Sequence, residues 1–131
     1  MRDFMLKEPV ELTLPAQQNM MLVLRLTTAG VIARAGLTVD RMDDVKLAVE
    51  EACSCLISAP TAPNRLCLRF REDEQGLKIG VRAQSGSPAC VVSEDEREVV
   101  QCILESLVDG VELHMQGEAI DAIEMRVALE R

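Results

Sequence analysis

The stretch from Val45 to Ile57 constrains the fold of this 131-residue chain more than any other. Its apolar side chains recur at helical spacing, at Val45, Val49, Ala52, Cys53 and Leu56. This spacing predicts an amphipathic helix with one face packed on a core. Glu51 and Cys55 stand four residues apart along the edge of that face. Such a pair can present a base and a metal ligand to a nucleotide, but an exposed flank and a half-buried filler would show the same spacing.

Alternating stretches predict strands, and Gly, Pro and polar clusters separate them from helical stretches. Strands are expected over 10–14, 66–71, 77–82, 111–114 and 123–129. Helices are expected over 16–35, from Thr38 or Asp40 to before Pro60, and over 94–109. Ser93 and Glu96 form a capping-box pattern at the third helix. The turn at 73–76 predicts a β-hairpin.

This order of elements predicts the fold class α+β. Strands mostly joined by hairpins, with helices on one face, form a two-layer α/β sandwich. The sheet is expected to be mixed but mostly antiparallel. The length fits a single domain over 1–131, and 48% apolar residues are enough to bury a core.

The apolar residues of the first predicted helix cover more than a narrow stripe, so we expect the helix to be buried on two sides. Gly36 is expected to end it. Arg25 is a charge inside this apolar helix. Its stem could pack while the guanidinium reaches solvent. Alternatively, it could anchor a partner's carboxylate, because Arg is favoured at interface hot spots.

Composition excludes several classes of function. The chain has two Phe and no Trp or Tyr, which argues against base-stacking platforms and aromatic cages. A net charge of −8 argues against nucleic acid and suits a basic protein partner. No apolar run is long enough for a membrane span, and the N-terminus has no signal-peptide pattern, so a cytoplasmic protein is expected.

The five cysteines form no CxxC pair, and there is one His, so no metal site is expected. An odd number of cysteines, mostly in apolar runs, indicates reduced core residues. Cys53, Cys55 and Cys102 could report redox state if they met in space, but inert buried thiols are the favoured interpretation.

Three stretches in register resemble one family. The family's first helix, which carries an arginine, is similar to LVLRLTTAGVIARAGLT. Its N-box helix is similar to DDVKLAVEEACSCLI, and the stretch after its glycine-rich box is similar to ILESLVDGVEL. The family is the RsbW/SpoIIAB group of bacterial anti-sigma factors, serine kinases with the GHKL (Bergerat, HATPase_c) ATP-binding fold. The resemblance covers about 11–129. It implies that Arg25 contacts a sigma factor and its antagonist.

The departures from the family pattern concern the nucleotide site. Glu51 falls on the catalytic-base position, but Cys55 replaces the asparagine that holds Mg²⁺, and a thiol is a poor ligand for that cation. Ala83 replaces the aspartate that reads adenine, and Gly86 stands in a degenerate glycine box. Glu98 adds a carboxylate where phosphate would lie. No catalytic residue is therefore expected to be active, and no ATP or metal is expected to bind.

The first hypothesis is a non-catalytic, pseudokinase-like partner switch. It would bind a sigma factor or a STAS-type anti-anti-sigma protein through Arg25, and would form a homodimer through its first helix and strand.

Two alternatives stay open. An active serine/threonine kinase would use ATP and Mg²⁺, with Glu51 as base and Gln84 or Ser85 reading adenine. A small-molecule sensor or structural dimer would reuse the fold. Its sign would be a pocket lined by Leu47, Cys55, Ala83 and Cys102.

Overall fold

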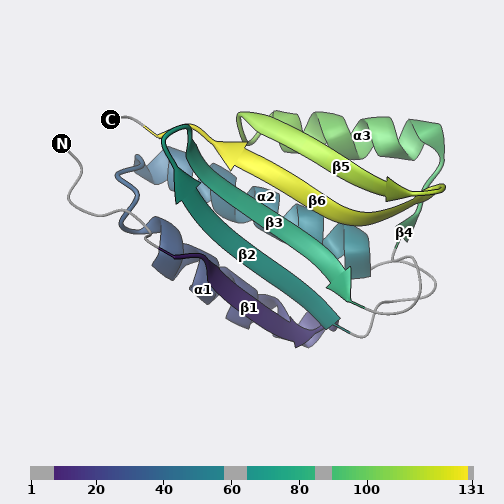
Figure 1. Ribbon diagram of the computed structural model, residues 1–131, viewed down its shortest axis with the longest axis horizontal. Helices are drawn as coiled ribbons and strands as arrows, with labels where there is room; N and C mark the ends of the chain where they lie inside the picture. The colour runs from purple at the N-terminus through teal and green to yellow at the C-terminus, as the bar shows by residue number, and fades with distance from the viewer. Residues whose placement is uncertain (1–7, 58–64, 85–89, 130–131) are drawn as a thin grey trace.

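The computed structural model describes residues 8–57, 65–84 and 90–129 (Figure 1). In chain order the elements are β1 (Val10–Pro15), the one-turn 3₁₀ helix η1 (Gln18–Met20), α1 (Met21–Ile32), α2 (Val39–Ile57), β2 (Arg65–Asp73), β3 (Gly76–Gln84), β4 (Cys90–Val91), α3 (Glu94–Glu105), β5 (Gly110–Gln116) and β6 (Ala119–Val127). Two of the residues considered for the nucleotide site, Ser85 and Gly86, lie outside the described residues.

One sheet forms the first layer. Its strands follow the order β1-β2-β3-β6, with β5 along the other side of β6 and the short β4 pairing the start of β6. Every strand pair among the described residues is antiparallel. The helices lie on one face of the sheet, behind it in the view of Figure 1. The predicted two-layer α+β sandwich is confirmed, except that the described sheet is antiparallel throughout and not mixed.

The core lies between the sheet and α2. The apolar face predicted for α2 is confirmed, because the five residues that defined it are buried. Alternate residues of β2 and β3 meet that face, and each large side chain buried this way contributes about 1.5–3 kcal/mol. The fully buried side chains of these two strands are Leu66, Leu68, Phe70, Leu77, Ile79 and Val81.

The β2–β3 hairpin is confirmed, and local hydrogen bonding explains its turn. The Asp73 carboxylate accepts a 2.8 Å hydrogen bond from the Gln75 backbone N–H. Gly76 then adopts φ +132°, which side chains rarely allow, and it approaches the Val127 carbonyl closely. The turn therefore needs glycine at this position.

The prediction of one helix over 16–35, buried on two sides, is wrong. Residues 18–20 form η1, α1 ends at Ile32, and the chain then turns to Gly36 (φ 77°). Leu24 and Ile32 are buried, whereas large apolar side chains on the opposite side of α1 are exposed. The apolar residues on all sides of α1 therefore reflect a solvent-exposed surface and not burial on two sides.

The capping box at α3 is confirmed. The Glu96 N–H donates to Ser93 Oγ and the Ser93 N–H to Glu96 Oε1, both at 3.1 Å. The predicted extension of this helix to Asp109 is wrong, because α3 ends at Glu105. The Asp109 N–H instead donates to the Arg126 carbonyl, which draws the chain into the sheet.

The remaining boundaries differ by a few residues. The last strand spans Ala119–Val127 and does not reach 129, and β5 extends to both sides of the predicted 111–114. The two-residue β4 was not predicted, because it is too short to show a period. At the start of α2, Thr38 acts as the cap, since its hydroxyl accepts the Arg41 N–H at 3.2 Å.

Candidate functional site

Helix α2 carries two of the residues assigned to a nucleotide site. Glu51 is exposed, and Cys55 is half-buried and packs against the core. Leu47 lies one turn before Glu51 and is also exposed. This end of α2 therefore offers solvent a carboxylate and a leucine on one face.

The predicted adenine-reading region is only partly described. Ala83 is half-buried near the end of β3 and pairs with Leu66, and Gln84, exposed, ends the strand. Gly86 and Ser85 lie outside the described residues.

The structure does not bring the expected sensor-pocket residues into one hollow. Cys102 lines a groove of about 440 Å³ between α3 and β5, together with Glu98 and apolar side chains of β5. Ala83 lines a different hollow on the outer side of the sheet. Leu47 and Cys55 line neither of the two.

The cysteines differ in environment. Among the described residues, Cys53, Cys55, Cys67 and Cys102 form no disulfide. Burial, with a smaller effect of the Glu50 carboxylate, raises the pKa of Cys53 to about 12. Cys53 is therefore a protonated core residue, whereas Cys102 is exposed on α3.

Arg25 lies on the exposed side of α1 and pairs with a carboxylate of its own chain. Its Nε donates to Glu50 Oε1 on α2, and the side chains are 54% and 23% exposed respectively. Around it, Leu22 (60% exposed) and Leu26 (65% exposed) face solvent, as does Val23. We call Leu22, Val23, Arg25 and Leu26 the α1 surface.

Sequence reasoning missed Glu50. The only signal was a lone arginine on an apolar helix, and its side chain, 54% exposed, does not require a carboxylate partner. Which of the many acidic residues supplies that carboxylate depends on how α1 packs against α2.

Two further findings limit the chemistry of the described residues. Among them, no three His, Cys, Asp or Glu side chains come together as metal ligands would. Within the same part of the chain, no helix has the length and apolarity that a bilayer span requires.

No protein-family model matches the chain. It is 42% identical over 81 residues to the serine-protein kinase RsbW of Halalkalibacterium halodurans, covering 61% of this chain and 50% of that protein. It is 35% identical over 75 residues to the serine-protein kinase RsbW of Bacillus subtilis, covering 55% and 41%. The chain is RsbW-like. It spans half or less of the length of these relatives.

A solved structure supports the fold of this RsbW-like chain. The crystal structure of the RsbU and RsbW domains of Rv1364c from Mycobacterium tuberculosis matches 95% of the chain, and 33% of its own, with a TM-score of 0.73. The sequences are only 15% identical, so this likeness concerns the fold alone. The predicted GHKL-type fold class is confirmed.

Proposed function

We propose that this RsbW-like chain is an anti-sigma-type regulator that acts by binding proteins through the α1 surface. The observation that carries the proposal is the grouping of three exposed apolar side chains around Arg25. Exposed apolar patches of this kind mark interaction sites, and Arg is enriched among the residues that dominate binding energy. The RsbW relatives support the regulatory class.

The partner is a sigma factor, a STAS-domain anti-anti-sigma protein, or both in turn. A carboxylate on the partner would form an ion pair with the Arg25 guanidinium, either in place of Glu50 or together with it. Both can bind at once because the guanidinium has several N–H donors. The Arg25 side chain of this pair is 54% exposed, so solvent screens the interaction and breaking it costs little. The leucines would supply apolar burial around the new pair.

The test is an affinity measurement with the sigma factor and STAS protein encoded nearest to this gene. Arg25→Ala should weaken binding by 2 kcal/mol or more, about 30-fold, as a hot-spot residue does. Its stability should change by less than about 1 kcal/mol. Arg97→Ala, which removes the same charge from α3, is the control. Wild-type affinity in Arg25→Ala would remove this role.

The proposal includes loss of ATP binding. Cys55 and Ala83 cannot supply the oxygen ligand and hydrogen-bond acceptor that the family uses. Several such losses together would raise a micromolar dissociation constant for ATP above about 1 mM. With ATP and Mg²⁺ at about millimolar concentration, the melting temperature should therefore not rise.

An active serine kinase is the second candidate, because the curated relatives carry that name. Glu51 is exposed and could act as the base. Transfer of labelled phosphate from ATP to the STAS protein, abolished in Glu51→Gln, would establish this function. Absence of transfer, together with intact partner binding, would favour the regulator.

A further inference from the structure

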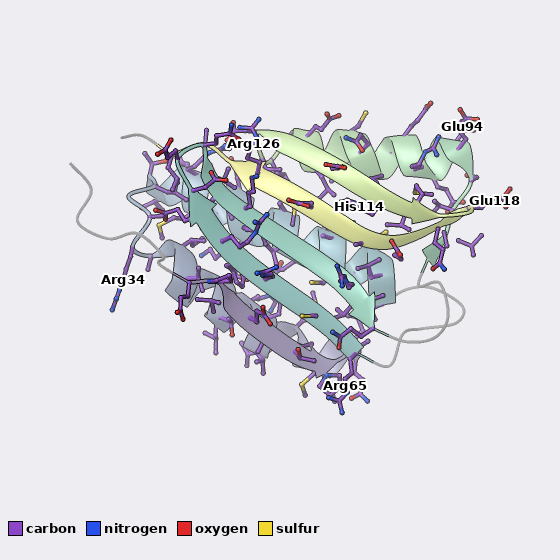
Figure 2. All side chains as sticks on the ribbon, viewed as in Figure 1. Arg34, Arg65, Glu94, His114, Glu118 and Arg126 are labelled. Atoms are coloured by element: carbon purple, nitrogen blue, oxygen red, sulfur yellow. The ribbon has the colours of Figure 1, made fainter. Side chains whose placement is uncertain are left out.

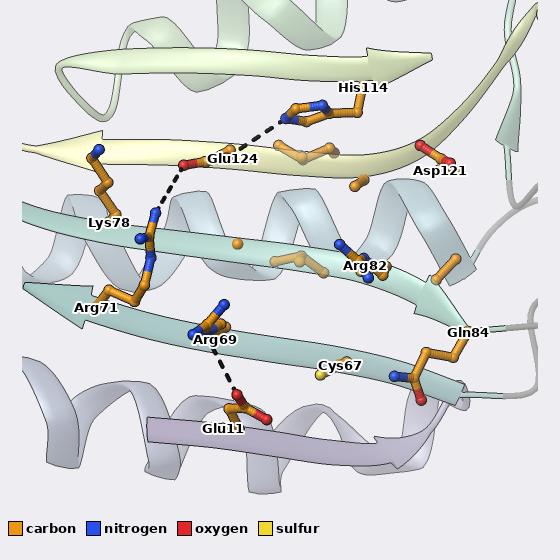
Figure 3. A pocket seen from close by; sticks show the side chains of 15 residues that line it. Glu11, Cys67, Arg69, Arg71, Lys78, Arg82, Gln84, His114, Asp121 and Glu124 are labelled. Atoms are coloured by element: carbon orange, nitrogen blue, oxygen red, sulfur yellow. Dashed lines mark ion pairs between the residues drawn. The ribbon is translucent and has the colours of Figure 1, made fainter. Parts of the chain in front are cut away.

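The outer face of the sheet, on the side opposite the described helices, holds a broad hollow (Figure 3). Its volume is about 710 Å³. The strands β1, β2, β3, β5 and β6 all contribute to its lining. Because this face lies opposite the helices, the hollow is separate from the α1 surface and from the proposed nucleotide region on α2.

Gly80 forms the floor of the hollow. No heavy atom lies within 4 Å of the position that a Cβ at Gly80 would take. Arg69 lies directly opposite on β2, and Lys78 and Arg82 lie two residues to either side on the same face of β3. Only one carboxylate, Glu124 on β6, is an equally close neighbour. Three cations therefore surround an open floor. Lys78 Nζ also lies 3.3 Å from Asp73 Oδ2, and the carboxylates of Glu11 and Asp121 contribute to the lining of the hollow.

The ion pairs along this face are long and exposed. Arg71 Nη2 on β2 lies 3.6 Å from Glu124 Oε1 on β6, which it reaches across β3. Arg69 Nε lies 3.5 Å from Glu11 Oε1 at the far side of β2. Exposed pairs of this kind contribute about 0–1 kcal/mol, so a better ligand can displace them.

Arg82 differs from its neighbours. In the described ranges it makes no ion pair, and its side chain stands over the hollow between the ends of β2 and β6 (Figure 3). It is therefore a cation with unused donors close to Arg69 and Lys78, which are both paired.

We propose that a small phosphate-bearing anion binds over Gly80, held by Arg69, Lys78 and Arg82. Guanidinium groups bind phosphate oxygens through two parallel hydrogen bonds, and an ammonium adds a point charge. A compact anion can reach the floor, whereas the long side chains of the rim would hold a flat protein surface away. The net charge of −8 repels extended polyanions such as nucleic acid.

The experiment is calorimetric titration of the whole chain with pyrophosphate at low salt. Arg82→Gln should weaken binding about tenfold, as loss of one charge-assisted contact does. Gly80→Val should abolish binding and keep the fold, because the floor is open and β-branched residues suit strands. Arg97→Gln on α3 removes the same charge elsewhere and should bind as wild type.

Three results would overturn the proposal. One is no measurable binding of pyrophosphate. Another is wild-type affinity in both Gly80→Val and Arg82→Gln. The third is tighter binding of a polyglutamate peptide than of pyrophosphate, which would make the face a protein-docking surface. Arg25→Ala should not change pyrophosphate binding, so the proposed function and this site can fail separately.

Discussion

Gly76 shows how a single residue fixes the β2–β3 turn. A Cβ at this position would lie 2.3 Å from the Val127 carbonyl oxygen, and φ is +132°. Gly76→Ala must therefore shift backbone, and we expect it to lower the free energy of unfolding by about 2–4 kcal/mol. Urea unfolding followed by circular dichroism measures this.

Gly80→Ala is the matched control for this prediction. It adds the same methyl group in the same strand, where nothing lies within 4 Å. The change in the free energy of unfolding should stay within about 1 kcal/mol. Equal losses in the two variants would contradict the account of the turn.

Cys53 and Cys102 should differ in reactivity. The pKa of Cys53 is raised to about 12, so near neutral pH it is buried and protonated. Iodoacetamide should label Cys102 in the native protein and Cys53 only after unfolding, as mapped by mass spectrometry. Native labelling of Cys53 at the rate of Cys102 would show that the core opens readily.

Residue-level prediction from the sequence succeeded for burial and failed for pairing. The spacing of Val49, Cys53 and Leu56 determines which face of α2 is buried, because a helix repeats regularly. The Arg25–Glu50 pair joins residues 25 apart on two helices. No local pattern encodes how those helices cross, so the pair could not be predicted.

At the scale of elements, the capping box makes the start of α3 sensitive to pH. The hydrogen bond from the Ser93 backbone N–H lowers the pKa of Glu96 below its ordinary value. Its contribution to stability is therefore complete above the unfolded-state pKa and is lost as pH falls through the lowered folded-state pKa. Urea midpoints of wild type and Glu96→Gln should converge as pH falls from about 7 to about 3.

Ser93→Ala separates the geometry of the cap from its charge. It removes the acceptor of the Glu96 N–H and should cost about 1 kcal/mol near neutral pH. A gap between wild type and Glu96→Gln that is constant over the whole pH range would contradict the assignment of the charge effect to this cap.

The elements that were predicted well have strong local signals. Alternation and a turn fixed the hairpin, and a serine with a glutamate three residues on fixed the start of α3. The length of α1 was overestimated because the helical pattern continues into η1 before the helix and into the turn at 33–36 after it. Its burial was overestimated because a sequence pattern does not reveal that Leu22, Val23 and Leu26 are exposed.

At the scale of the whole molecule, the outer sheet face is less acidic than the chain as a whole. Four Arg or Lys side chains and three carboxylates line its hollow, whereas the chain has a net charge of −8. Arg126 also lies over this face, whereas Glu94 lies on α3 (Figure 2). The fold could be predicted because element order and periodicity limit the topology. The grouping of cations on the outer face could not be predicted, since alternation was used only to find the buried face.

The most direct measurement is the affinity of the chain for its sigma-factor or STAS partner, with and without ATP and Mg²⁺, in wild type and Arg25→Ala. The account predicts that wild-type affinity does not depend on the nucleotide and that Arg25→Ala loses binding under both conditions. Binding that requires ATP and Mg²⁺, or that survives in Arg25→Ala, would contradict it.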